Sequence, residues 1–277
     1  MTTVPAARPH VGRPRGPVGA TGLASAAAVA GSDTAAAVFP EAGAGGYSRL
    51  DGSVEFWARV NAVLPPAAVV VDLGAGRGKF LEDPVGFRRR LHDLKPRCAR
   101  MIGLDVDPAV RHNTAVHESH VIDPAGPFPL ADASVDVLVS DWTFEHVTDP
   151  ARIAAEIDRV LRPGGWLCAR TPRKWGAIGI PTMLVPNRLH TAVLRRLQPG
   201  KAGRDTFPTA YRLNSHAALR RWFPTDRFSH HVYAYDAEPG YVGSSPAAMR
   251  AGLVLQRLVP SRAASTLMIF IRKQDTA

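Results

Sequence analysis

Three glycines separated by single residues follow an early apolar run, and this arrangement could bind a ligand through the backbone. Gly74, Gly76 and Gly78 come directly after residues 67–73, and Asp72 lies just before them. Glycine has no β-carbon, so the chain can turn sharply and a ligand can lie against its amides. The spacing is G-x-G-x-G, whereas a dinucleotide-binding fingerprint has G-x-G-x-x-G and would need a glycine at Lys79. Gly-rich turns alone are a weak signal, and the neighbouring acids decide the interpretation.

Two acidic residues follow later apolar runs, where parallel strands would bring them to the edge that holds the glycines. Asp105 ends the run 99–104, and its carboxylate could accept hydrogen bonds from both hydroxyls of a ribose. Asp107 is a rival for that role, although its position favours a helix cap. Asp123 follows the run 120–122 and could accept a hydrogen bond from an adenine amine. The alternative for Asp123 is a turn residue before Pro124.

Strands and helices must alternate to position these residues. Short apolar runs typical of buried strands lie at 67–73, 99–104, 120–122, 135–140 and 166–170. Helices are predicted at 53–64, at 80–94 with an interruption near Asp83-Pro84, and at 149–161, where Pro150 suits a first turn. Further helices are predicted at 214–222 and 246–258, and further strands at 227–235 and 265–271. This order predicts an α/β fold with an open, doubly wound, mostly parallel sheet.

The composition of the 277 residues narrows the function classes. The formal net charge is +10, but residues 1–46 carry +1, residues 47–150 carry −4 and residues 151–277 carry +13. The basic part could attract phosphates, nucleic acid, acidic glycans or an anionic membrane face, or it could simply be a solvated surface. No apolar run approaches the roughly 18 residues of a membrane span. Two cysteines exclude a disulfide scaffold or a cysteine-rich zinc site, so we expect a reducing, cytoplasmic location and no metal.

Four blocks of the sequence resemble the class I S-adenosylmethionine-dependent methyltransferases, in their small-molecule, methyltransferase type 11-like branch. The blocks are VVVDLGAGRGKF at 69–80, MIGLDVDP at 101–108, FPLADASVDVLVSDWTFEHV at 128–147 and DPARIAAEIDRVLRPGGWLCART at 149–171. The resemblance implies S-adenosyl-L-methionine as cofactor. It also implies a seven-stranded Rossmann-like sheet with a reversed last strand, which suits the run 265–271.

The resemblance also implies roles for residues around the cofactor. The three glycines would let the backbone approach the methionine part of the cofactor, and Asp72 would lie close to its amino group. Asp105 would bind the ribose, and Asp123 would bind the adenine edge. Asp141 and Trp142, which follow the fourth strand, would face the methionine end and the acceptor.

Methyl transfer needs a nucleophile held in line with the breaking C–S bond, with water excluded. If the acceptor is a hydroxyl, a nearby base helps the reaction. Glu145 and His146, just past the fourth strand, are the candidate bases, with Asp141 and His190 as further candidates. The alternative for His146 is packing at the start of the helix 149–161.

Composition and motifs divide the chain into four parts. Residues 1–46 are rich in Ala, Gly and Pro and are predicted to be a disordered leader, so that ordered structure begins near Tyr47. Residues 47–172 form the S-adenosylmethionine-binding half, and residues 214–277 complete the sheet of the same domain. Residues 173–213 are too long for a simple connector and predict a lid or substrate-binding insertion. Its apolar stripe over 184–197 predicts packing on the domain or peripheral contact with a membrane.

The acceptor is indicated by a second resemblance. Residues 185–200 and 207–214 resemble uncharacterised bacterial methyltransferases linked to cell-surface sugar pathways, which implies a small molecule, a glycan or a lipid-linked sugar hydroxyl as acceptor. The substrate-side candidates are Arg188, His190, Tyr211 and Arg212.

The sequence also bears on nucleic-acid acceptors and on other classes of protein. DNA is disfavoured because residues 140–143 read Ser-Asp-Trp-Thr instead of Asn/Asp-Pro-Pro-aromatic, and neither cysteine follows a proline. RNA stays open, because a basic half would bind phosphates. The remaining alternatives are an NAD-linked oxidoreductase and a non-catalytic cofactor-binding scaffold. The oligomeric state is not predicted.

Overall fold

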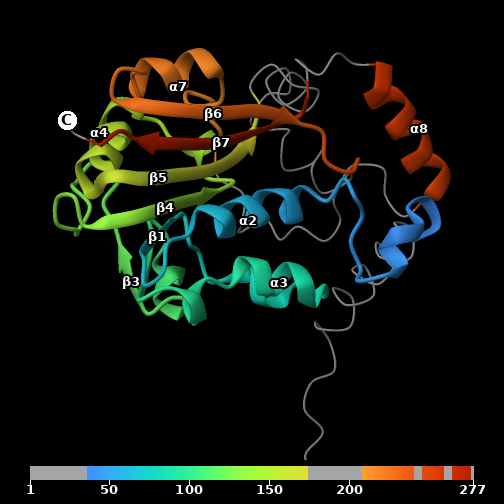
Figure 1. Cartoon of the computed structure of the whole chain (residues 1–277), viewed down its shortest axis with the longest axis horizontal. Coiled ribbons are helices and arrows are strands. Elements are labelled where there is room, and N and C mark those ends of the chain that lie inside the picture. The colour runs from blue at the N-terminus through green and yellow to red at the C-terminus, as the bar shows by residue number, and fades with distance from the viewer. Residues whose placement is uncertain (1–35, 174–207, 240–244, 259–263, 276–277) are drawn as a thin grey trace, which may run out of the picture.

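A seven-stranded sheet forms the centre of the protein, shown in Figure 1 as a computed structural model that describes residues 36–173, 208–239, 245–258 and 264–275. The strands are β1 (Val69–Leu73), β2 (Arg100–Asp105), β3 (Glu118–Val121), β4 (Val135–Asp141), β5 (Leu161–Pro172), β6 (Phe228–Tyr235) and β7 (Thr266–Lys273). Their order is β3-β2-β1-β4-β5-β7-β6. The strands from β3 to β5 pair in parallel, while β7 is antiparallel to both β5 and β6. The predicted mostly parallel sheet with a reversed last strand is therefore confirmed.

Helices cover both faces of this sheet, which explains why the central strands are almost wholly apolar. Residues of β1 point alternately to the two sides: Val71 packs in one buried cluster and Val70 in another. The first cluster is closed by α4 (Pro150–Val160) and α7 (His216–Trp222), and the second by α2 (Gly52–Val63). α3 (Gly86–His92) lies beside α2 (Figure 1).

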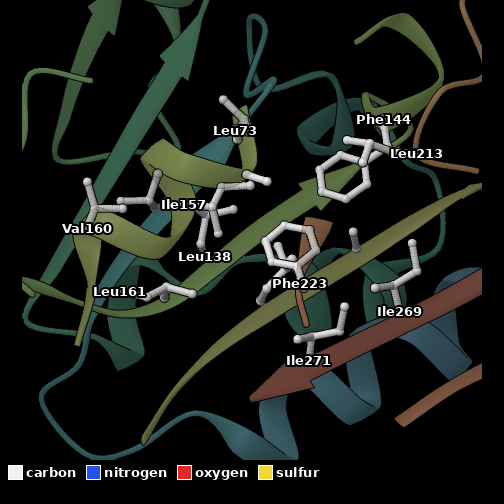
Figure 2. Packing of buried hydrophobic residues seen from close by; sticks show 14 of the residues in the cluster. Leu73, Leu138, Phe144, Ile157, Val160, Leu161, Leu213, Phe223, Ile269 and Ile271 are labelled. Atoms are coloured by element: carbon white, nitrogen blue, oxygen red, sulfur yellow. The ribbon is translucent and has the colours of Figure 1, made fainter. Parts of the chain in front are cut away.

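Figure 2 shows the first cluster, in which aromatic and aliphatic side chains from distant parts of the sequence meet. Phe144 follows β4, Leu213 precedes α7 and Phe223 follows it, and all three are fully buried. This packing fixes the turn after β4 and residues 208–213 to the same end of the sheet, where the predicted site residues lie.

Side-chain caps set several helix starts. The Asp51 carboxylate accepts hydrogen bonds from the amides of Ser53 and Val54 at 2.8 and 2.9 Å. The Asp149 carboxylate accepts one from the Arg152 amide at 3.1 Å, as expected for the cap of α4. The expected helix at 80–94 is divided into η2 (Lys79–Glu82) and α3, as the interruption near residues 83–84 predicted. Further short 3-10 helices are η3 (Lys95–Arg97), η4 (Pro108–His112) and η5 (Phe144–His146).

Ordered structure begins earlier than Tyr47, which corrects the predicted extent of the disordered leader. Residues 36–46 include the 3-10 helix η1 (Pro40–Gly43), and Phe39 and Ala42 are 3% and 5% exposed. These two side chains pack against Met249 of α8 (Pro246–Leu258). Phe39 is the single aromatic residue of the first 46, and its burial supplies apolar contact that a composition average does not register. Residues 1–35 lie outside the described ranges.

None of the helices within the described ranges has the length and apolar character to cross a membrane.

Candidate active site

The glycine loop lies between β1 and η2 at the carboxyl edge of the sheet. Gly74, Gly76 and Gly78 have φ values of 88°, 48° and 76°, which favour glycine. A β-carbon at Gly78 would lie 2.6 Å from Oδ1 of Asn113, whereas one at Gly76 would meet nothing within 4 Å. The Asn113 amide also donates hydrogen bonds to the carbonyl oxygens of Ala75 and Gly76, at 3.0 and 3.2 Å. The loop is therefore held from one side and leaves open space beside Gly76, where a ligand can approach the backbone.

Asp105, at the end of β2, holds the same loop through its carboxylate. Its Oδ2 accepts a hydrogen bond from the Gly76 amide at 2.8 Å, and its Oδ1 accepts one from the Asp107 amide at 2.8 Å. Asp107 in turn accepts a hydrogen bond from the Ala109 amide at 2.8 Å, which confirms its predicted role as a cap. Each carboxylate oxygen can accept a second hydrogen bond, so these contacts are compatible with the predicted ribose role of Asp105.

Three carboxylates end the neighbouring strands β1, β2 and β4. Burial raises the pKa of Asp72 to about 7, and the negative charges of Asp141 and Asp105 add to the shift. Ionisation of Asp72 is costly because the carboxylate is partly withdrawn from water and because like charges lie nearby. A positively charged group bound among the three carboxylates would reduce this cost. The electrostatics of this edge therefore favour a cationic ligand.

Arg170, near the end of β5, is a residue of this site that the motif analysis missed. Its Nε and Nη2 donate to Oδ1 and Oδ2 of Asp141, each at 2.7 Å. Arg170 is 6% exposed, and its guanidinium lies 5.3 Å from the ring centre of Phe56 and 5.1 Å from that of Trp142. The available signal was a basic residue at the end of the otherwise apolar run 166–170. Because both oxygens of Asp141 are engaged, the structure favours a positioning role for Asp141, and its catalytic role stays a prediction.

Trp142 follows β4 and presents an indole at the edge where the ligand space opens. Its side chain is among the exposed large apolar ones, with the residue 41% exposed, and its φ is 57°. A bulky residue in this left-handed region is strained, and the surrounding contacts must hold it there. One such contact is the hydrogen bond from the Trp142 amide to the Arg170 carbonyl oxygen at 2.8 Å. The position agrees with the predicted orientation toward an acceptor, which stays a prediction.

Glu145 is buried in a polar network behind the turn after β4. Its Oε2 accepts a hydrogen bond from the Thr171 hydroxyl at 2.8 Å, and Thr171 Oγ1 accepts one from the Asn214 amide at 2.6 Å. Burial raises the pKa of Glu145 above its usual value. The Glu145 side chain is 7% exposed. Its contacts thus join the ends of β4 and β5 to the start of α7.

His146 connects the same turn to the segment that precedes α7. Its Nδ1 donates a hydrogen bond to the Pro208 carbonyl oxygen at 2.9 Å, which places the proton of the neutral ring on Nδ1. The backbone amides of Ala210 and Tyr211 donate to the Glu145 carbonyl oxygen at 2.7 and 3.1 Å. His146 Nε2 lies 4.0 Å from Glu145 Oε1. These contacts agree with a packing role and also fix the ring orientation that a base would need.

The remaining predicted residues are placed as follows. Asp123 Oδ1 accepts a hydrogen bond from the Ala125 amide at 2.8 Å, the geometry of a turn aspartate. Its adenine role stays a prediction. Tyr211 is buried with a φ of 51°, and Arg212 donates to the Thr148 carbonyl oxygen at 2.7 Å. Arg188 and His190 lie outside the described residues, as do residues 174–207 as a whole.

His92 is a second residue that sequence reasoning missed. Its ring stacks between those of Trp57 and Phe80, with centroid distances of 3.7 and 3.8 Å. Burial lowers its pKa to about 4, so the ring is neutral at physiological pH; Asp141 raises that pKa and Arg170 lowers it. The stack connects α2 and α3 to η2, directly after the glycine loop. No spacing in the sequence marked this contact, because the three rings come from separate elements.

A glycine loop after β1, a carboxylate after β2 and a 3-2-1-4-5-7-6 sheet with β7 reversed define the Rossmann-like methyltransferase fold. Residues 71–169 match the sequence model of a family described as a methyltransferase domain. This part of the chain is a class I S-adenosylmethionine-dependent methyltransferase domain, and S-adenosyl-L-methionine is its cofactor.

The relatives share this part of the chain. An uncharacterised methyltransferase of Mycobacterium sp. (strain JLS) is 32% identical over 114 residues, which cover 40% of this chain and 41% of the relative. Dimethylglycine N-methyltransferase of Parasynechococcus marenigrum (strain WH8102) is 34% identical over 113 residues, covering 37% of this chain and 36% of the relative. The match thus spans about two fifths of the length of these curated relatives.

One solved structure supports the fold alone. It is the methyltransferase bound to the Trm112 methyltransferase activator of Haloferax volcanii, with a TM-score of 0.50 and 20% identity, covering 81% of this chain and 92% of that chain.

Proposed function

We propose that the whole protein transfers a methyl group from S-adenosylmethionine to a hydroxyl of a small molecule or of a glycan or lipid-linked sugar. The observation that carries the cofactor side of the proposal is the set of three carboxylates, Asp72, Asp105 and Asp141, beside the open backbone at Gly76. The cofactor carries an α-ammonium and a sulfonium, so its methionine end is cationic. Pairing with such a group would stabilise the ionised form of Asp72, whose pKa is raised to about 7.

The residues present fit this cofactor. Gly76 leaves space for a ligand against the backbone, and Asp105 lies at the neighbouring strand end with capacity for further hydrogen bonds. Asp72 would hold the ammonium group. Trp142 would border the methionine end, because its exposed indole follows β4 at the same edge of the sheet.

The chemistry needs little from the protein beyond positioning and exclusion of water. When bound, the cofactor would supply an electrophilic methyl group on sulfur, and transfer would exchange its C–S bond for a C–O bond to the acceptor. Arg170 and Asp141 fix the wall of the site through their paired hydrogen bonds. The acceptor hydroxyl must lose its proton during transfer, and a base of this chain would take it.

His146 is the better placed of the two candidate bases. The Glu145 side chain is 7% exposed, and its Oε2 accepts a hydrogen bond from the Thr171 hydroxyl. Glu145 is therefore part of the buried polar network. The hydrogen bond from His146 Nδ1 to Pro208 leaves the basic lone pair of the neutral ring on Nε2. We infer that Nε2 accepts the hydroxyl proton.

The sugar acceptor rests on the resemblance of residues 185–200 and 207–214 to methyltransferases of surface-sugar pathways. Of the substrate-side candidates in the described ranges, Arg212 is engaged with the Thr148 carbonyl oxygen, so it holds the segment beside the site. Arg188 and His190 remain the candidates for direct contact with a hydroxylated acceptor.

Calorimetric titration of the purified full chain with S-adenosylmethionine, S-adenosylhomocysteine and NAD tests the cofactor. We expect micromolar binding of the first two and none of NAD. Binding of NAD alone would replace the proposal with a redox function. Cofactor binding without turnover on sugars, lipid-linked glycans, small hydroxyl compounds or RNA would instead support a non-catalytic scaffold.

A further inference from the structure

The outer face of α8 carries an unusual group of exposed aliphatic side chains. Val254, Leu255 and Leu258 are 55%, 66% and 76% exposed, which makes them the most exposed large apolar residues in the described ranges. With the exposed Ala251 they have the spacing i, i+3, i+4 and i+7, so all four lie on one side of the helix. We call these four residues the α8 apolar face.

The opposite side of the same helix is occupied. Met249 is buried and Leu253 packs with it against Phe39 and Ala42. Gln256 donates a hydrogen bond to the Ala237 carbonyl oxygen at 3.0 Å. α8 is therefore anchored to the protein by one side, and its exposed apolar side is not needed for that anchoring.

Positive charge flanks the α8 apolar face on one side, and the helix carries no negative charge. Arg250 and Arg257 are exposed and lie one above the other beside Val254, and residues 246–258 contain no acidic residue. Both features are typical of helices that lie in the interface of an anionic membrane, with aliphatic side chains among the acyl chains and arginines at the phosphates. Figure 1 shows α8 on the side of the sheet where the parallel strands end, which is the side of the candidate active site.

A second copy of the chain fits this face poorly. A two-fold pairing would bring the same basic helix against itself, with no acidic residue on it to offset the arginines. Three aliphatic side chains also supply far less than the roughly 1,200 Å² that a stable protein–protein interface buries. Shallow insertion into a bilayer needs no such area.

We propose that α8 is an interfacial membrane-binding helix, which docks the protein on anionic lipid through the α8 apolar face and its two flanking arginines. The proposal is independent of the acceptor and of methyl transfer. It differs from the contact predicted for residues 184–197, because it rests on side chains whose exposure is observed.

Co-sedimentation of the full chain with vesicles tests the proposal. We expect binding to phosphatidylcholine vesicles that contain phosphatidylglycerol, little binding to phosphatidylcholine alone, and weaker binding as salt is raised. The triple variant Val254→Ser, Leu255→Ser, Leu258→Ser should bind roughly tenfold more weakly or worse. The variant Arg250→Gln, Arg257→Gln should lose most of the preference for anionic lipid.

Leu81→Ser is the matched control, since it removes an exposed leucine, 43% exposed, from another surface and should bind vesicles like the wild type. Thermal unfolding and cofactor titration of each variant show whether the fold is retained, and the untouched Met249 contact predicts that it is.

Three outcomes would overturn the proposal: no binding of the wild type to either vesicle, wild-type binding by the triple variant, or a dimer of the wild type that the triple variant loses. A failure of the proposed methyl transfer would leave the vesicle result unchanged, so the two ideas fail separately.

Discussion

Arg170 holds Asp141 in a two-point ion pair, with Nε to Oδ1 and Nη2 to Oδ2 each at 2.7 Å. Both partners are largely buried, with side chains 7% and 15% exposed. The pair joins the carboxyl ends of β4 and β5 and provides the positive charge that partly offsets the three carboxylates. Removing one partner of such a pair leaves the other charge uncompensated in a poorly hydrated place.

Substituting Arg170 tests whether this pair sets the charge of the site. In Arg170→Met, Asp141 is no longer neutralised, so the pKa of Asp72 should rise above about 7. Less Asp72 is then ionised at neutral pH, and we expect S-adenosylmethionine affinity to fall about tenfold, with the pH for half-maximal affinity moved upward. Calorimetric titration across pH 6–9 measures both effects.

The double variant Arg170→Met, Asp141→Asn restores the charge balance and should recover much of the lost affinity. Arg170→Lys keeps the positive charge but cannot make both hydrogen bonds to Asp141, so it should show a smaller shift in the pH dependence of cofactor affinity. If cofactor affinity depended on pH in the same way in Arg170→Met and in the wild type, the pair would have a purely structural role.

Asp72 should make both stability and cofactor binding depend on pH. The pKa of Asp72 is about 7 in the folded protein and lies near its ordinary value of 3.8 in the unfolded chain, so the folded state binds the extra proton between these values. Stability from this group is therefore lost as pH rises from about 4 to 7. We expect Asp72→Asn to be about 1–3 kcal/mol more stable than the wild type at pH 8, with the difference vanishing near pH 4.

The same substitution should have the opposite effect on the ligand. Wild-type affinity for S-adenosylmethionine should increase as pH rises through about 7, because Asp72 becomes ionised, whereas the affinity of Asp72→Asn should be low and nearly constant. Urea unfolding and calorimetry at several pH values give the two readouts. Equal stability of the two proteins at pH 8 would contradict the assigned environment of Asp72.

Asp105→Ala should weaken S-adenosylmethionine binding at least tenfold, on the order of 1.4 kcal/mol, while the fold remains. The carboxylate would be lost both for the ribose and for the Gly76 amide that it holds at 2.8 Å. We therefore also expect a decrease in the free energy of unfolding of about 1 kcal/mol.

Asp107→Ala is the matched control for Asp105. It removes a helix cap two residues away, including the hydrogen bond from the Ala109 amide, and should reduce stability by a similar amount with little change in affinity. If both variants bound the cofactor like the wild type, the ribose assignment would be wrong.

His146→Ala and His146→Gln together separate a catalytic base from a packing residue. If Nε2 accepts the acceptor proton, turnover should fall about a hundredfold in both variants, with cofactor affinity retained. If the ring serves only to hold Pro208, Gln should keep most of the activity and Ala should lose stability first. Single-turnover rates and thermal unfolding distinguish the two cases.

Local patterns in the sequence determined the order of elements, the sheet and the cofactor loop. Apolar runs such as 67–73 and 135–140 are typical of parallel strands that are buried on both faces of a sheet, and the glycines after the first run mark its turn. The capping residues Asp107 and Asp149 were also readable, because a cap is a contact within a few residues.

Contacts between distant residues were decided by the tertiary structure alone. The pairing of Arg170 with Asp141 spans 29 residues, and the stack of His92 on Trp57 and Phe80 joins three elements. Neither has a spacing rule, because each depends on how strands and helices are placed in space. The same holds for Phe39, whose burial required α8, more than 200 residues further along the chain. Local sequence specifies local geometry, whereas charge pairing, pKa shifts and the packing of a single aromatic ring arise only when separate segments meet in the fold.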